Sequence, residues 1–114
     1  MSILFNENPL TVNVELARKI GLNESIVLQQ IQYWIKINEK AERNYHDGYY
    51  WTYNTYQEWQ KQFPFWSLRT IRRIFTQLES NGFVVVENYN KLKIDRTKWY
   101  RIDYKALESA VNSP

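Results

Sequence analysis

Residues 55–82 read TYQEWQKQFPFWSLRTIRRIFTQLESNG and contain the signals for two consecutive helices. Either Asn54 or Thr55 is a suitable N-cap residue for the first helix, and Glu58 has the spacing of a capping box with Thr55. Pro64 ends this helix, because a proline disfavours helical backbone at the residue before it. We therefore expect a short helix that begins at Thr55 and ends two residues before Pro64.

The second helix is predicted to begin at Ser67, a strong N-cap residue, and to run to about Asn81, where Gly82 stops it. Its apolar residues recur at the spacing of successive helical turns and are expected to pack on the core. These apolar residues are Leu68, Ile71, Ile74, Phe75 and Leu78. The rings of Phe65 and Trp66, between the two helices, are also expected to wedge into the core.

The other side of the second helix is polar and basic. At about 100° per residue, the residues opposite the apolar side are Arg69, Arg73, Thr76 and Ser80. The residues that flank them are Thr70, Arg72 and Gln77. The single acid of this helix, Glu79, lies near its C-terminal end. We expect this side, with its three arginines, to face solvent.

A change of sequence period follows Gly82 and predicts a β-hairpin. Residues 83–87 are apolar and β-branched, residues 88–97 are polar and basic, and residues 99–104 alternate between two sets of side chains. Two strands joined by a charged loop fit this pattern. The basic residues in and beside the loop, which outnumber its one acid, Asp95, are Lys91, Lys93, Arg96 and Lys98.

A helix, a tight turn, a second helix and a β-hairpin follow each other in the order of a winged helix-turn-helix. The sequence therefore predicts an α+β, mostly helical domain of this type, with the hairpin as a C-terminal wing. A helix fits the major groove of B-form DNA, where an arginine donates two hydrogen bonds to guanine. The N-terminal end of a helix also favours phosphate, through its free N–H groups and its dipole.

These features predict a duplex DNA-binding domain without enzymatic activity. Arg69, Thr70 and Arg73 are placed to contact base edges, and Ser67 and Arg72 to contact phosphates. The wing is expected to lie along the phosphate backbone or to enter a minor groove. The full set of predicted DNA-binding residues is Ser67, Arg69, Thr70, Arg72, Arg73, Gln77, Lys91, Lys93, Arg96 and Lys98.

Three further helices are predicted outside this region. A brief one spans Val14–Ile20 and ends at Gly21, a common residue just past a helix C-terminus. A long amphipathic one begins at Asn23, its expected N-cap, and runs to Lys40. The polar residues 42–48 should then form a loop. A terminal helix over residues 104–111 closes the chain.

The aromatic run at residues 49–53 predicts a strand. Residues 10–14 alternate between apolar and polar side chains, so they are the expected partner, which gives an additional short N-terminal strand pairing. We expect one domain over residues 10–108, with tails at residues 1–9 and 109–114. An aromatic surface for stacking single-stranded bases is not expected, because no basic residue interrupts the aromatic run.

Composition excludes several function classes. The chain is 44% hydrophobic and 17% aromatic, whereas a disordered chain has few aromatic residues. The absence of cysteine excludes disulfides and thiolate metal sites, and the single histidine, His46, has no second imidazole nearby in the sequence. No catalytic motif or acid–base pair is visible. We therefore expect no enzyme, no metal and no cofactor.

The net charge of +3 is a mild bias, so the placement of the charges carries the argument for DNA. The N-terminal residues, which include Asn6 and Glu7, do not have the pattern of a signal peptide. No apolar run approaches the roughly 18–20 residues that span a bilayer. We therefore expect a cytoplasmic protein with no membrane partner.

Three segments carry a resemblance to a known family. They are GLNESIVLQQIQYW at residues 21–34, YQEWQKQFPFWS at 56–67 with RTIRR at 69–73, and NYNKL at 88–92 with DRTKWY at 95–100. Together they resemble the N-terminal winged-helix domain of replication proteins from phages and prophages of Gram-positive bacteria. These families include replisome organisers and proteins with DnaD-type modules.

The resemblance implies a role in replication initiation, through origin binding and recruitment of partners such as a helicase loader. Such proteins often continue into a C-terminal module that binds the loader or single strands. Two alternatives stay open. The domain is a protein–protein interaction module within a replication complex, or it is a winged-helix transcriptional regulator. A homodimer, formed through the helix around Trp34 or through the last helix, would fit the regulator.

Overall fold

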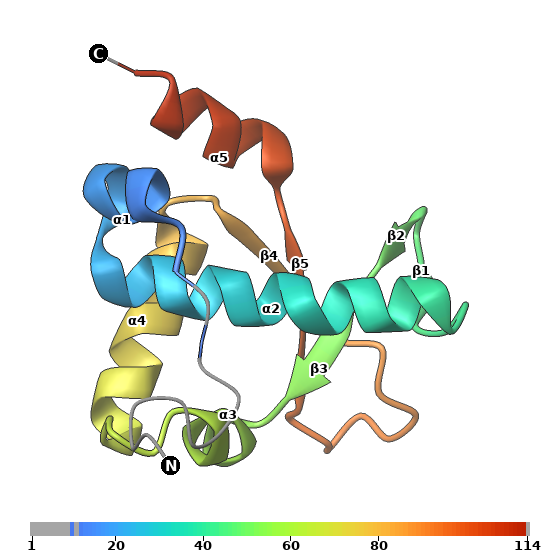
Figure 1. The fold of residues 1–114 in the computed structure, drawn as a ribbon. Coiled ribbons are helices and arrows are strands. Elements are labelled where there is room, and N and C mark those ends of the chain that lie inside the picture. The colour runs from blue at the N-terminus through green and yellow to red at the C-terminus, as the bar shows by residue number, and fades with distance from the viewer. Residues whose placement is uncertain (1–9, 11, 114) are drawn as a thin grey trace, which may run out of the picture.

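The computed structural model describes Leu10 and residues 12–113, and it is an α+β fold in which about half of these residues are helical (Figure 1). The predicted tail at residues 1–9 lies outside the described residues. The helices are α1 (Val14–Ile20), α2 (Leu22–Lys40), α3 (Tyr56–Gln62), α4 (Leu68–Ser80) and α5 (Tyr104–Val111). The strands are β1 (Tyr45–His46), β2 (Tyr49–Tyr50), β3 (Thr52–Asn54), β4 (Val84–Glu87) and β5 (Lys98–Ile102).

The junction between α1 and α2 is a single glycine. Gly21 has φ 113° and is both the residue after α1 and the N-cap of α2, so Asn23 is not the N-cap that the sequence predicted. A Cβ on Gly21 would lie 2.6 Å from a carboxylate oxygen of Glu24. The Glu24 side chain can move away, so it is the positive φ that favours glycine at this position.

The caps of α3 and α4 confirm the sequence prediction. The backbone N–H of Glu58 donates to Thr55 Oγ1 at 3.2 Å, and the N–H of Thr55 donates to Glu58 Oε1 at 2.8 Å. This reciprocal pair is the capping box that fixes the start of α3. The N–H of Thr70 donates to Ser67 Oγ at 3.1 Å and caps α4. The chain between these helices is therefore short and defined at both ends.

The main sheet has the order β3-β5-β4 and is antiparallel throughout. β5 lies in the middle, because Tyr100 is paired with Thr52 of β3 on one side and with Val86 of β4 on the other. The predicted pairing of residues 10–14 with the aromatic run is therefore wrong. Asn13 caps α1 and Val14 begins it, so this segment is used for a helix start rather than for a strand.

A small second hairpin replaces the loop predicted at residues 42–48. β1 and β2 pair antiparallel across Asp47 and Gly48, which have φ values of 53° and 87°. Two consecutive residues with positive φ form the tight turn whose twist matches that of the strands. The Asp-Gly dipeptide is a signal for this turn, but the polar composition around it favoured a loop. The predicted strand at residues 49–53 divides at Trp51 into β2 and β3.

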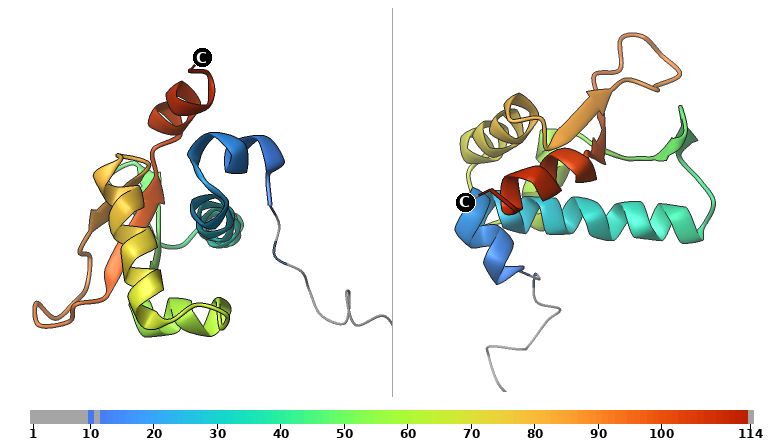
Figure 2. Two further views of the ribbon diagram at one scale, coloured as in Figure 1. Left: turned by 90° about the vertical axis from the view of Figure 1, so that its left-hand side faces the viewer. Right: turned by 90° about the horizontal axis from the view of Figure 1, so that it is seen from above.

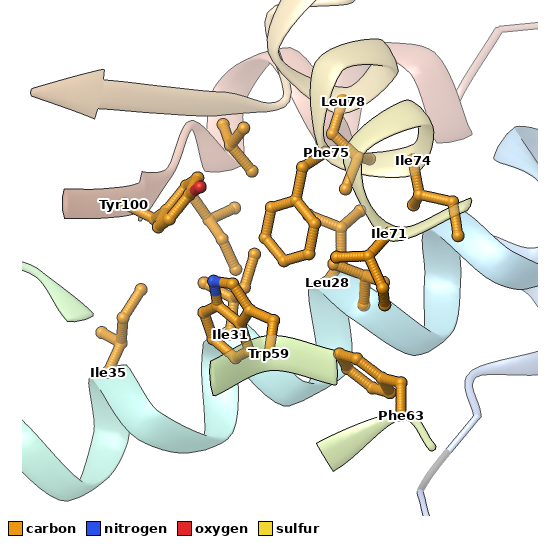
Figure 3. Close-up of a cluster of buried hydrophobic side chains, with 13 residues drawn as sticks. Leu28, Ile31, Ile35, Trp59, Phe63, Ile71, Ile74, Phe75, Leu78 and Tyr100 are labelled. Carbon is orange, nitrogen blue, oxygen red and sulfur yellow. The ribbon is translucent and has the colours of Figure 1, made fainter. Parts of the chain in front are cut away.

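The core lies between α2, α3, α4 and the sheet (Figure 3). Trp59 of α3 is fully buried at its centre, and its ring centroid lies 5.2 Å from that of Phe75 and 6.1 Å from that of Tyr100. Trp66 packs against this core as predicted, whereas Phe65 is 59% exposed, contrary to the prediction.

Helix α5 has no residue among the buried side chains of this core and packs on α1, where Lys19 Nζ donates to the carbonyl oxygen of Ser113 at 2.7 Å.

Replacing Trp59 with Ala should lower the free energy of unfolding by about 3–5 kcal/mol, because the largest side chain at the centre of the core would leave a cavity. Urea denaturation measures this change. The control is Phe65→Ala, which removes a mostly exposed ring from the neighbouring turn and should change stability by no more than about 0.5 kcal/mol. Equal losses for the two variants would contradict this description of the core.

Candidate nucleic-acid interface

Helix α4 presents a fully buried side and an arginine-bearing side. Ile71, Ile74, Phe75 and Leu78 are at most 1% exposed. The residues of α4 that are exposed to solvent are Arg69, Arg72, Arg73, Thr76, Gln77, Glu79 and Ser80. The predicted orientation of this helix is therefore confirmed for these four apolar residues and for the three arginines, which meet solvent. Leu68, which was also expected to pack on the core, is only half buried and lies outside it.

The first turn of α4 differs in part from the prediction. Ser67 is exposed, but its hydroxyl accepts from the N–H of Thr70 and donates to Thr70 Oγ1 at 3.1 Å. Thr70 is only half exposed. The Ser67 hydroxyl is thus used both as donor and as acceptor, whereas the Thr70 hydroxyl accepts one hydrogen bond and keeps its own proton available. Arg69 and Arg73 are the long donors on this side of the helix.

The β4–β5 loop (residues 88–97) is held in shape by one side chain. Asn90 Nδ2 donates to the carbonyl oxygens of Asp95 and Thr97 at 3.0 and 2.7 Å, and Asn90 Oδ1 accepts from Trp99 Nε1 at 2.7 Å. Asn90 therefore connects the two arms of the loop to each other and to Trp99 at the start of β5. Nothing in the sequence distinguishes Asn90 from the other polar residues of the loop.

The basic residues of the β4–β5 loop face solvent, and its one acid, Asp95, is exposed beside them. Lys91, Lys93 and Arg96 are exposed. The carboxylate of Asp95 accepts from the N–H of Thr97 at 2.9 Å, and this backbone hydrogen bond holds the pKa of Asp95 below its ordinary value. The loop consequently presents three cations to solvent with an acid that is hydrogen-bonded to its own backbone.

A groove joins the loop to α4. Its volume is about 410 Å³, and Arg72 of α4, Arg96 of the loop and Lys98 at the start of β5 all line it. Tyr56, the first residue of α3, lies between them. Its hydroxyl accepts from Lys98 Nζ at 2.9 Å, and its ring centroid lies 5.7 Å from the Arg72 guanidinium carbon. Cations from α4 and β5 therefore both contact Tyr56, and Arg96 of the loop lines the same groove.

Tyr56 is the residue of this groove that sequence reasoning missed, since nothing in its local pattern distinguishes it from an ordinary residue in the first turn of a helix. The charge of Lys98 is partly offset, because Glu79 Oε2 lies 4.0 Å from its ammonium nitrogen. Arg72 and Arg96 have no acid recorded within ion-pair distance among the described residues. The groove as a whole is therefore cationic.

Aromatic stacking fixes the base of the β4–β5 loop. The ring of Tyr89 stacks on that of His46 at a centroid distance of 4.3 Å, and the Tyr89 hydroxyl donates to the carboxylate of Asp47. Burial, followed by this contact with Asp47, raises the pKa of Tyr89 to about 12. His46 thus has a packing role that connects the β1–β2 hairpin with the loop.

Helix α4 and the β4–β5 loop lie on the same side of the molecule, with α2 on the other (Figure 2). The N-terminal end of α4 and the loop also project toward the same end of the domain. The structure brings together Arg72, Arg96 and Lys98 in the groove. Arg69, Arg73 and Gln77 lie on the exposed side of α4, whereas Lys91 and Lys93 belong to the tip of the loop.

Replacing Asn90 with Ala should loosen the β4–β5 loop and lower the free energy of unfolding by about 1–3 kcal/mol, because the indole N–H of Trp99 would lose its hydrogen-bond partner. Trypsin should then cleave faster at Lys91, Lys93 or Arg96, which limited proteolysis with mass spectrometry measures. Asn112→Ala, in an exposed position at the end of α5, is the control. Equal cleavage rates in the two variants would show that Asn90 does not hold the loop.

Comparison of the chain with protein-family models, with curated proteins and with solved structures gives no match in any of the three. Within residues 12–113, no helix has the length and apolar character needed to cross a membrane. The same residues contain no cluster of three or more histidine and acidic side chains that would suit a metal ion.

Proposed function

We propose that this domain is a winged helix-turn-helix that binds duplex DNA. In this proposal α3 and α4 are the helix-turn-helix, α4 lies in the major groove, and the β4–β5 loop is the wing. The observation that carries the proposal is the groove around Tyr56, which joins the arginine side of α4 to the basic loop and makes one cationic surface of them. A cationic surface of this kind favours the phosphate backbone of a duplex, because cations that neutralise phosphates release bound counterions.

The arrangement gives the residues of this surface different roles. Arg69 and Arg73 are long donors on the side of α4 that faces away from the core, so they are assigned to base edges in the major groove. Gln77, one turn further along, extends this reading side. Arg72 and Arg96 point into the cationic groove and are assigned to phosphates. Thr70 contributes less than the sequence predicted, because it is only half exposed.

The biological setting that fits this proposal is initiation of phage or prophage replication. It is supported by the resemblance of three segments, at residues 21–34, 56–73 and 88–100, to the winged-helix domains of such replication proteins. Those segments supply α2, the helix pair α3–α4 and the basic loop with β5. In this setting the domain recognises origin DNA, and the recruitment of a helicase loader is assigned to other parts of the complex.

Replacing both Arg69 and Arg73 with Ala should weaken binding to a preferred duplex by about 1–3 kcal/mol for each base contact that is lost. Binding is measured by fluorescence anisotropy at fixed salt, first on random duplex, single strand and candidate origin DNA. The control is the double variant Lys36→Ala and Lys40→Ala, which removes the same charge from exposed positions on α2, on the other side of the molecule. Equal affinity of both double variants for the duplex would contradict the assignment of α4 as the reading helix.

Replacing Lys91, Lys93 and Arg96 with Ala should weaken binding to every duplex alike and reduce its salt dependence. The slope of log affinity against log salt should become shallower by about 0.9 for each phosphate contact that the loop makes. The α2 control variant should keep the slope of the unmodified protein. If the unmodified protein has no affinity for duplex at low salt but binds a replication protein in a salt-insensitive way, the domain is an interaction module instead.

A further inference from the structure

The tip of the β4–β5 loop carries two large apolar side chains that the fold leaves in solvent. Ile94 is 87% exposed and Leu92 is 66% exposed, and neither belongs to the core or packs against it. Val14, the only other described large hydrophobic side chain above 60%, lies far away at the start of α1. Exposed apolar side chains on a soluble domain are common singly, but two within one tight turn call for a partner.

The tip of the loop is a hydrogen-bonded turn. The N–H of Asp95 donates to the carbonyl oxygen of Leu92 at 3.1 Å, which closes the turn that holds Ile94. Asn90 then connects the far arm of the loop, at Asp95 and Thr97, to the near arm. The apolar pair is therefore presented on a scaffold that is already in shape before any partner arrives.

Charge indicates which partner the tip would meet. Lys91, Lys93 and Arg96 are exposed and lie beside the two apolar residues in the sequence, and they outnumber the one ionised carboxylate of the loop, that of Asp95. Exposed cationic side chains next to exposed apolar side chains suit a polyanion whose interior is apolar. In duplex DNA the phosphates provide the charge, and the faces of the stacked bases provide the apolar surface.

We propose that Leu92 and Ile94 enter the minor groove beside the major-groove segment occupied by α4 and partly separate one base step there. This inference rests on the proposed function, because it needs the same duplex to contact α4. Figure 2 shows the loop and α4 on the same side of the molecule, so a single duplex can contact both. Apolar wedges of this kind bend the duplex by about 20–90° toward the major groove, which here means around α4.

The proposal carries a sequence preference that no base contact would produce. Pyrimidine–purine steps such as TA separate most easily, so the preferred site should have one under the tip, at a fixed offset from the bases read by α4. Changing this step to a stiff one should weaken binding of the unmodified protein. The same change should leave the affinity of a variant without the wedge almost unaltered.

The test measures DNA bending by fluorescence resonance energy transfer between the two ends of a bound duplex, at saturating protein. The unmodified protein should bend the duplex by tens of degrees. Its binding should also raise the fluorescence of 2-aminopurine placed at the TA step. The double variant Leu92→Ser and Ile94→Ser should still bind the duplex but leave it nearly straight, with no rise in 2-aminopurine fluorescence. Leu92→Met with Ile94→Met, which keeps both side chains apolar, should restore the bend.

The matched control is Val14→Ser with Leu22→Ser, which removes two exposed apolar side chains from α1 and α2 and should bend the duplex fully. A straight duplex with the unmodified protein, or equal bending by the Leu92/Ile94 serine variant, overturns the wedge and leaves the DNA-binding proposal standing. Absence of any duplex binding by the unmodified protein overturns both. Binding to anionic phospholipid vesicles that the serine variant loses, without DNA bending, assigns the tip to a membrane surface and also overturns the wedge.

Discussion

Removal of the apolar side of α4 from water determines how the rest of this domain is arranged. Ile71, Ile74, Phe75 and Leu78 are essentially inaccessible because Trp59, α2 and the sheet cover them. Each such side chain contributes on the order of 1.5–3 kcal/mol when it is buried, so the helix has one strongly preferred rotation about its axis. The arginines are forced outward by that preference. Their exposure is thus a consequence of packing, and it makes the basic surface available without any further adjustment of the fold.

Local signals in the sequence were sufficient for most of the helices. The capping box at Thr55, the cap at Ser67 and the glycine after α1 each act through neighbouring residues, so they can be recognised without knowledge of the fold. The strand pairing could not be recognised in this way. β3 lies beside β5, which is almost half the chain away, and a short alternating pattern at residues 10–14 was an equally plausible partner by local criteria. A helix start at Asn13 outweighed that pattern.

In the candidate site, too, some residues could be predicted from the local sequence, whereas others depend on contacts between elements that are distant in the sequence. The exposed arginines of α4 and the basic residues of the loop could be predicted, because helical period and charge clustering are visible in the sequence. Their connection through Tyr56 could not be predicted, since it depends on α3, α4 and β5 meeting at one point. Nor could the role of Asn90, whose side chain spans the loop. Residues of this kind act between elements and carry no periodic signal of their own.

The central place of β5 in the sheet also bears on how the chain folds. β5 is hydrogen-bonded to β3 from the N-terminal half and to β4 from the C-terminal half, so neither half contains a complete sheet. The helices can form early from short-range contacts, but the sheet must wait until two distant segments have met, with the entropy cost of closing a long loop. The domain is accordingly a single cooperative unit with a higher contact order than a helical bundle of the same size. Non-local strand pairing of this kind slows folding relative to a helical bundle, in which most contacts are local.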